Sequence, residues 1–155
     1  MSGKLTTIVF DIGSVLIRWD MRNLYRKVFD DSARMEWFLA NICTHDFNIE
    51  QDRGRPFAEA VADLSRKHPE WKAEIELYDS RWTEMLDGTI SGTVDILGEL
   101  QQKNWPTYAI TNFSREKFDV SRKLFPFLDT FRGTVVSADE RELCRKLGDG
   151  MKKAA

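Results

Sequence analysis

The fold class follows from one stretch near the start of the chain, Thr6-Thr7-Ile8-Val9-Phe10-Asp11-Ile12-Gly13-Ser14-Val15-Leu16. Its apolar run predicts a buried strand whose carboxyl end carries Asp11. Ligands of open α/β sheets bind outside the carboxyl ends of the strands, so Asp11 lies where chemistry is expected. Gly13 lets the backbone approach a ligand closely, and the N–H groups of the turn can face an anion. We therefore predict that Asp11 is a nucleophile.

A second segment has the same organisation, Trp105-Pro106-Thr107-Tyr108-Ala109-Ile110-Thr111-Asn112-Phe113-Ser114. It predicts a short strand that follows an amphipathic helix and ends in small polar side chains. Thr111 and Asn112 are then expected at the same edge of the sheet as Asp11. A hydroxyl and an amide can hold a phosphate or carboxylate oxygen by hydrogen bonds without adding charge.

These residues resemble the motifs of a known family, the haloacid dehalogenase-like (HAD) hydrolases. The segment Phe10-Asp11-Ile12-Gly13-Ser14-Val15-Leu16 is similar to the first motif of that family, and Ile110-Thr111-Asn112 is similar to the second. The helical stretch between them resembles the family's helical cap, in the branch of small sugar-phosphate phosphatases. The resemblance implies an α/β fold with an incomplete Rossmann-like parallel sheet, in which residues 1–18 and 89–155 form the core and residues 19–88 form a cap inserted after the first strand.

The resemblance also implies a mechanism and a cofactor. Asp11 would attack the phosphoryl group of a small phosphorylated metabolite, and water would hydrolyse the aspartyl ester. The Asp11 carboxylate and the backbone carbonyl of Gly13 would bind Mg²⁺, which prefers such oxygen ligands. Thr111 and Asn112 would hold phosphoryl oxygens, and Lys146 is the candidate for the lysine that screens charge on the nucleophile.

One departure from the family pattern favours a different hydrolase. The commonest phosphatase motif has a second Asp two residues after the nucleophile as general acid and base, where this chain has Gly13. The 2-haloacid dehalogenases of the family also lack that acid and need no metal. They use an arginine to hold the substrate carboxylate and the halide, and Arg53 and Arg55 are the candidates for it here. A 2-haloacid dehalogenase is therefore an alternative function.

A larger departure follows Glu140. The family pattern continues with a lysine, a helix and a strand that ends in paired acids, whereas this chain runs from Arg141 to Ala155 without them. We therefore expect a chain truncated or altered near residue 141, and a catalytically inactive fragment or binding protein is a further alternative. We also expect an unpaired sheet edge and exposed apolar surface near Val135-Val136, which favour self-association. Leu143, Leu147 and Met151 are spaced as one face of a helix that could cover part of that surface.

Composition restricts the class of partner and the location. The 155-residue chain has a net charge of −2 and a pI near 5.8, which argues against nucleic acid and anionic membrane surfaces as partners. No apolar run approaches the ~20 residues that span a bilayer, and the N-terminus lacks a signal-peptide pattern, so a cytoplasmic location is expected. Cys43 and Cys144 have no metal-binding or redox spacing, and His45 and His68 are expected at the surface or at helix ends.

Apolar spacing predicts the remaining elements in the order strand, helical block, strand, helix, strand. Three helices follow the i, i+3, i+4, i+7 pattern, around 21–28, 35–42 and 57–64, and a fourth is expected over 74–86. Residues 88–92 are predicted to form a linker, and a helix that carries Val94, Leu97 and Leu100 is predicted to follow it. We expect Asp20 to be a helix N-cap, and we expect the tryptophans to lie in the core, except that Trp19 lines the entrance between cap and core.

Overall fold

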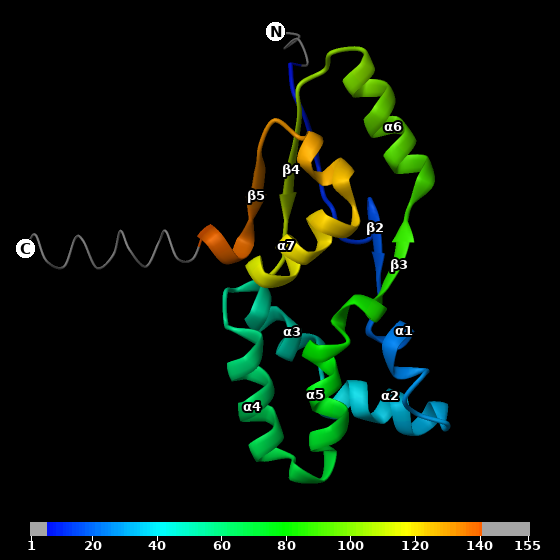
Figure 1. Ribbon diagram of the computed structural model, residues 1–155, viewed down its shortest axis with the longest axis vertical. Helices are drawn as coiled ribbons and strands as arrows, with labels where there is room; N and C mark the ends of the chain where they lie inside the picture. Colours follow the sequence, from blue (N-terminus) through cyan, green and yellow to red (C-terminus); the bar gives the residue numbers. More distant parts are fainter. Residues whose placement is uncertain (1–5, 141–155) are drawn as a thin grey trace, which may run out of the picture.

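The computed structural model of the chain describes residues 6–140, and its centre is a parallel sheet of three strands. Strand β4 (Thr107–Thr111) lies between β1 (Ile8–Phe10) and β5 (Thr134–Val136) and pairs with both in parallel. The carboxyl ends of all three strands point towards a layer of helices at one end of the molecule (Figure 1). The predicted α/β class is confirmed.

Two crossover helices connect the parallel strands, α6 (Ser91–Gln102) before β4 and α7 (Arg115–Leu124) after it. Each successive strand in the order β1-β4-β5 is added on the same side of the one before it. Crossovers between parallel strands are right-handed, so both helices lie on the same face of the sheet. Accordingly, alternate residues of β4 are buried under this face, and the Gln101 side chain of α6 donates to the Thr107 hydroxyl at 3.1 Å. A 3₁₀ helix, η3 (Pro126–Thr130), completes the layer before β5.

The opposite face of the sheet is apolar and exposed within residues 6–140. It carries Val9, Tyr108, Ile110 and Val135, which are large hydrophobic side chains open to solvent. The prediction of exposed apolar surface near β5 is confirmed for Val135, which is 43% exposed, and wrong for Val136, which is 1% exposed. Successive residues of a strand point to opposite faces, so only one of the two can be exposed. The predicted self-association stays a prediction.

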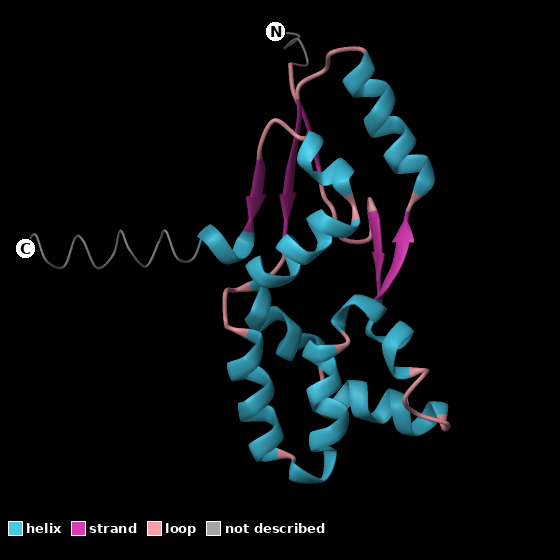
Figure 2. Cartoon of the chain, viewed as in Figure 1, coloured by secondary structure: helices cyan, strands magenta, loops and turns pink. Residues whose placement is uncertain are grey.

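The helical layer lies beyond the carboxyl edge of the sheet (Figure 2). It contains five α-helices and two 3₁₀ helices, namely α1 (Met21–Tyr25), α2 (Ser32–Asn41), α3 (His45–Asp52), α4 (Phe57–Lys67), η1 (Pro69–Trp71), α5 (Lys72–Ser80) and η2 (Trp82–Met85). Side-chain oxygens of Asp20, Asp31 and Thr44 accept from backbone amides in the first turns of α1, α2 and α3, which explains where these helices begin. The predicted N-cap at Asp20 is confirmed.

Aromatic side chains form the centre of the helical layer. Tyr25, Phe38 and Tyr78 are fully buried, and the rings of Tyr25 and Phe38 lie 5.0 Å apart between centroids. The prediction that the tryptophans are core residues is confirmed for Trp82, which is buried, but it is wrong for Trp37, which is 51% exposed. The ring of Trp37 instead packs on that of Trp71 near the surface, with 5.8 Å between their centroids.

The chain passes between the sheet and the helical layer along two short antiparallel strands, β2 (Ile17–Trp19) and β3 (Leu86–Thr89). The predicted helix over 74–86 is confirmed up to Ser80, where α5 ends, and is wrong beyond it, because the chain continues through η2 into β3. Pairing with β2 and the bond from the Asp20 amide to the Met85 carbonyl at 3.0 Å hold this segment extended. The expected cap boundaries, 18/19 and 88/89, fall inside these two strands.

The turn after α3 packs tightly on the segment after β5. Gly54 has a φ of +93°, which side-chain-bearing residues rarely adopt, and a Cβ built there would lie 3.3 Å from the carbonyl oxygen of Ala138. Only glycine fits both the backbone conformation and the close approach. This contact therefore fixes the end of α3 against the edge of the sheet. No helix of the described part of the chain is long and apolar enough to cross a membrane.

We predict that Gly54→Ala lowers the free energy of unfolding by about 1–3 kcal/mol, because it combines backbone strain with a close contact. Urea unfolding of both proteins measures the difference. The matched control is Gly98→Ala within α6, where a Cβ meets nothing within 4 Å, and it should stabilise by up to about 1 kcal/mol. Equal effects of the two substitutions would contradict the packing argument.

Candidate active site

A cavity of about 610 Å³ lies where the carboxyl edge of the sheet meets the helical layer. The turn after β1 contributes Asp11, Gly13 and Ser14 to its wall, and the end of β4 contributes Thr111 and Asn112. The structure thus brings together four of the five site residues that the sequence predicts. The fifth, Lys146, lies outside the described residues, as does Cys144.

Asp11 stands at the end of β1 with its side chain exposed to the cavity. One carboxylate oxygen accepts from the Ile12 amide at 2.7 Å, which orients the group. The turn closes when the Ile12 carbonyl accepts from the amides of Leu16 and Ile17, at 2.9 and 3.1 Å. A Cβ at Gly13 would meet no atom within 4 Å, so the space beside this backbone is open to a ligand.

Thr111 is the last residue of β4; it is one of the residues that line the cavity, and it is only 4% exposed. Its hydroxyl has no hydrogen-bond partner in the structure. A buried hydroxyl without a partner is uncommon, because leaving it unpaired costs about 1–3 kcal/mol. The arrangement suits a ligand oxygen that completes the bond. Asn112, the next residue, is exposed on the same wall.

The helical layer contributes residues to the cavity that the sequence did not indicate. Asp52, at the end of α3, lines it together with Asn48, whose amide donates to the Asp52 carboxylate at 3.0 Å. Burial raises the pKa of Asp52 to about 6. No motif or spacing points to Asp52, because its role in the wall depends on how α3 docks on the sheet.

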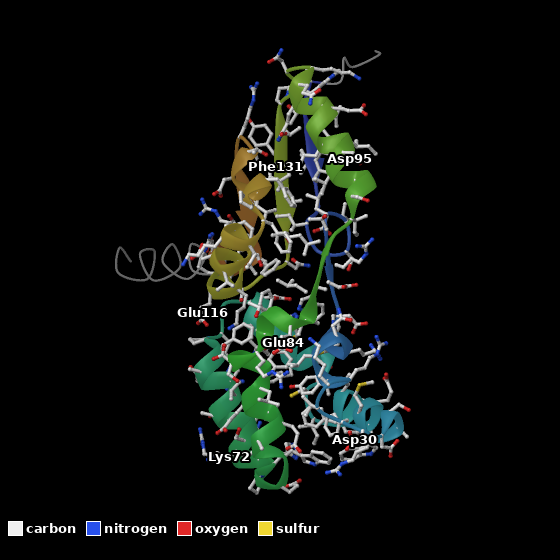
Figure 3. All side chains as sticks on the ribbon, turned by 45° about the vertical axis from the view of Figure 1, so that its right-hand side comes forward. Asp30, Lys72, Glu84, Asp95, Glu116 and Phe131 are labelled. Atoms are coloured by element: carbon white, nitrogen blue, oxygen red, sulfur yellow. The ribbon has the colours of Figure 1, made fainter. Side chains whose placement is uncertain are left out.

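Lys117 of α7 is the second residue that the sequence did not indicate. Its side chain is 12% exposed, pairs with the carboxylate of Asp79 in α5, and lies with its ammonium nitrogen 4.4 Å from the centroid of the Phe57 ring in α4. A core helix is thus tied to two helices of the other layer beside the cavity. Figure 3 shows the labelled Glu116, its neighbour, at the end of α7 that faces the helical layer.

Of the remaining residues that the sequence singles out, some line the cavity and others do not. Trp19 lines the cavity as expected, and Arg53 is also on its wall. His45 is exposed at the start of α3, as expected for a residue at a helix end, but it lines the cavity as well. Arg55 is not on this wall and instead pairs with Asp63. Cys43 is a free, buried thiol whose pKa burial raises to about 12, which makes it an inert core residue.

The residues that line the Asp11 cavity offer few ligands for a metal ion. Within residues 6–140 no group of three or more histidine, cysteine or acidic side chains could hold a metal ion. Asp11 and Gly13 nevertheless line the same cavity, and a carboxylate oxygen with a backbone carbonyl oxygen is a pair of donors that Mg²⁺ accepts together with substrate oxygens and water.

Comparison with known proteins gives similarity only to solved structures, since no protein-family model and no curated protein matches the chain. The HAD family enzyme BT-2542 from Bacteroides thetaiotaomicron is 18% identical, with a TM-score of 0.64 over 97% of this chain and 80% of that one. Its complex with magnesium and inorganic phosphate is 19% identical, with a TM-score of 0.60 over 96% of this chain and 80% of that one.

A variant of the same enzyme in which an aspartate is replaced by alanine, also in complex with magnesium and inorganic phosphate, is 20% identical, with a TM-score of 0.61 over 89% of this chain and 71% of that one. These similarities extend over most of both chains, and they include the parallel sheet and the helical layer. The chain therefore has the fold of the HAD family enzymes, as the segments around Asp11 and Thr111 predict.

Proposed function

We propose that the chain is a Mg²⁺-dependent phosphatase of small phosphorylated metabolites that acts through an aspartyl-phosphate on Asp11. The observation that carries the proposal is that Asp11 and Thr111 line one cavity and that the buried Thr111 hydroxyl has no hydrogen-bond partner among the described residues. A tetrahedral phosphate between the two would accept a hydrogen bond from one and meet the nucleophile of the other. The complexes of BT-2542 with magnesium and inorganic phosphate support this choice of ligand.

Each predicted site residue within residues 6–140 has a role in this proposal. Asp11 attacks the phosphorus atom, and Thr111 and Asn112 hold phosphoryl oxygens. The carboxylate of Asp11 and the carbonyl of Gly13 would hold Mg²⁺, which when bound neutralises charge on the phosphate and the nucleophile. Residues 19–88 would form the cap, and residues 1–18 and 89–155 would form the core. The protein would act in the cytoplasm.

Arg53 favours a second candidate function, a 2-haloacid dehalogenase. Its side chain is on the wall of the Asp11 cavity, where a guanidinium can hold a substrate carboxylate in two hydrogen bonds. The two functions differ in their requirement for Mg²⁺, because the attack of Asp11 on a carbon atom in the dehalogenase reaction needs no metal. Release of chloride from a 2-chloroacid without Mg²⁺ would select the dehalogenase. Binding of phosphate without any turnover would select the inactive binding protein.

We predict that the purified chain hydrolyses an aryl phosphate only when Mg²⁺ is present, and that Asp11→Asn reduces turnover to the background rate. The amide keeps the shape of the side chain but cannot form the aspartyl-phosphate. The rate is measured from the absorbance of the phenolate that is released. Turnover that survives the substitution would overturn the nucleophile role of Asp11.

We predict that Thr111→Val lowers kcat by about 10²–10³-fold, because a donor to the reacting phosphoryl group is lost while the shape of the side chain is kept. Steady-state kinetics on the same aryl phosphate measures the change. The matched control is Ser121→Ala in α7, which removes another buried hydroxyl without a partner that does not line the cavity. Both variants should remain folded, and only the first should lose activity; equal activity in the two would contradict the role of Thr111.

A further inference from the structure

Asp52 is the second carboxyl group on the cavity wall. Within residues 6–140, Asp11 and Asp52 are the two acidic side chains that line the cavity, one from the turn after β1 and one from the end of α3. Gly13 occupies the position at which the commonest phosphatase motif of the HAD family carries its acid. The turn after β1 therefore offers no second proton carrier, and the opposite wall does.

The backbone of Asp52 is fixed to the edge of the sheet. The Ser137 hydroxyl, directly after β5, donates to the carbonyl of Asp52 at 2.6 Å and accepts from the amide of Phe113 at 3.0 Å. One hydroxyl thus joins the end of α3 to the segments that follow β4 and β5, the strands whose carboxyl ends face the helical layer in Figure 1. Asp52 is held in position although it belongs to the helical layer.

The side chain of Asp52 is oriented as well. The Asn48 amide donates to one carboxylate oxygen at 3.0 Å, and the Tyr78 hydroxyl donates to the Asn48 carbonyl oxygen at 2.6 Å. Tyr78 is itself fully buried in the helical layer. This chain of bonds fixes the carboxyl group, and a fixed geometry is what proton transfer at a reacting atom requires.

Burial makes the protonated form of Asp52 accessible near neutral pH. It raises the pKa to about 6, whereas the charge on His45 and the amide of Ser114 lower it. The ionisable groups around it come from every neighbouring element. They are His45 of α3, Arg53 directly after α3, Tyr78 of α5, Asp11 after β1 and Lys117 of α7. Lys117 is paired with Asp79, so its charge is already partly compensated.

We propose that Asp52 is the general acid and base of this site, so that the catalytic proton comes from the cap rather than from the strand that carries the nucleophile. The role rests on the proposed phosphatase function. In the first step Asp11 forms a bond to phosphorus, the bond from phosphorus to the ester oxygen breaks, and Asp52 gives its proton to that oxygen. In the second step water attacks phosphorus, Asp52 takes a proton from the water, and the bond from Asp11 to phosphorus breaks.

The test compares two substrates in the unaltered chain and in Asp52→Asn, with Mg²⁺ present. An alkyl phosphate has a basic leaving group that needs a proton, whereas p-nitrophenyl phosphate has a leaving group that departs without one. We expect Asp52→Asn to lower kcat/KM for the alkyl phosphate by about 10²-fold or more and to change that for p-nitrophenyl phosphate far less. In the unaltered chain kcat/KM for the alkyl phosphate should fall as the pH rises above about 6, and the variant should lose this dependence.

Two controls separate this role from folding and from charge on α3. Asp46→Asn removes an exposed acid of the same helix that does not line the cavity, and it should leave both kcat/KM values unchanged. The raised pKa predicts that Asp52 adds most stability at low pH and that this contribution is lost as the pH rises through about 6. The difference in unfolding temperature between the unaltered chain and Asp52→Asn should therefore change over that range.

A third measurement does not depend on turnover. Sulfate keeps its double charge across this pH range, so calorimetric titration with sulfate reports the charge on the cavity wall. Its affinity should fall as Asp52 ionises, and Asp52→Asn should remove that fall. The same pH dependence in both proteins, or an equal loss of kcat/KM on both substrates, would overturn the role of Asp52. Absence of turnover in the unaltered chain would instead overturn the phosphatase proposal, and the role with it.

Discussion

The parallel pairing of β4 with both of its neighbours is the constraint on which the rest of the structure depends. It sends three strands in one direction, so the segments that follow them, at Asp11, Thr111 and Ser137, meet at one edge. Residues a hundred positions apart in the chain thereby share a cavity wall. Because the order β1-β4-β5 runs in one direction and crossovers between parallel strands are right-handed, both connecting helices lie on one face of the sheet.

The cavity has a second wall only because the helical layer is docked on that edge. Three contacts make the docking specific: the bond from Ser137 to the carbonyl of Asp52, the close approach of Gly54 to Ala138, and the pair between Lys117 and Asp79. Lys117 is mostly buried, and a buried ammonium group is stable only when it is paired. The same contacts that hold the layers together thus also place Asp52 on the wall of the cavity that Asp11 lines.

The sequence predicts those parts of the fold that have a local pattern. The strand that ends at Asp11, the strand that ends at Thr111 and the amphipathic helices were predictable, because burial of one face requires a regular spacing. Strands β2 and β3 were not, because they are three and four residues long and exist through their pairing with each other. The helix expected over 74–86 ends early, at Ser80, and Leu86 pairs with Trp19 of β2 instead, since pairing overrides the weak preference of a short segment.

The candidate site divides in the same way. Asp11, Gly13, Thr111 and Asn112 could be predicted because each follows directly from the end of a strand. Asp52 and Lys117 could not, since nothing near them in the chain distinguishes them from other charged residues on helices, and only the docking of the layers brings them to the cavity.

The two carboxyl groups meet different physical requirements, and their surroundings match these. A nucleophile must reach the substrate, and Asp11 stands exposed at the edge of the sheet with one oxygen held by an amide. A proton carrier must pass between its charged and neutral forms near neutral pH, and burial raises the pKa of Asp52 into that range. In the proposed mechanism the cap therefore supplies the group that the strand end lacks. Since that group reaches the reacting atoms only when the layers are docked, the proposed chemistry depends on the contacts of Ser137 and Gly54 as much as on Asp11.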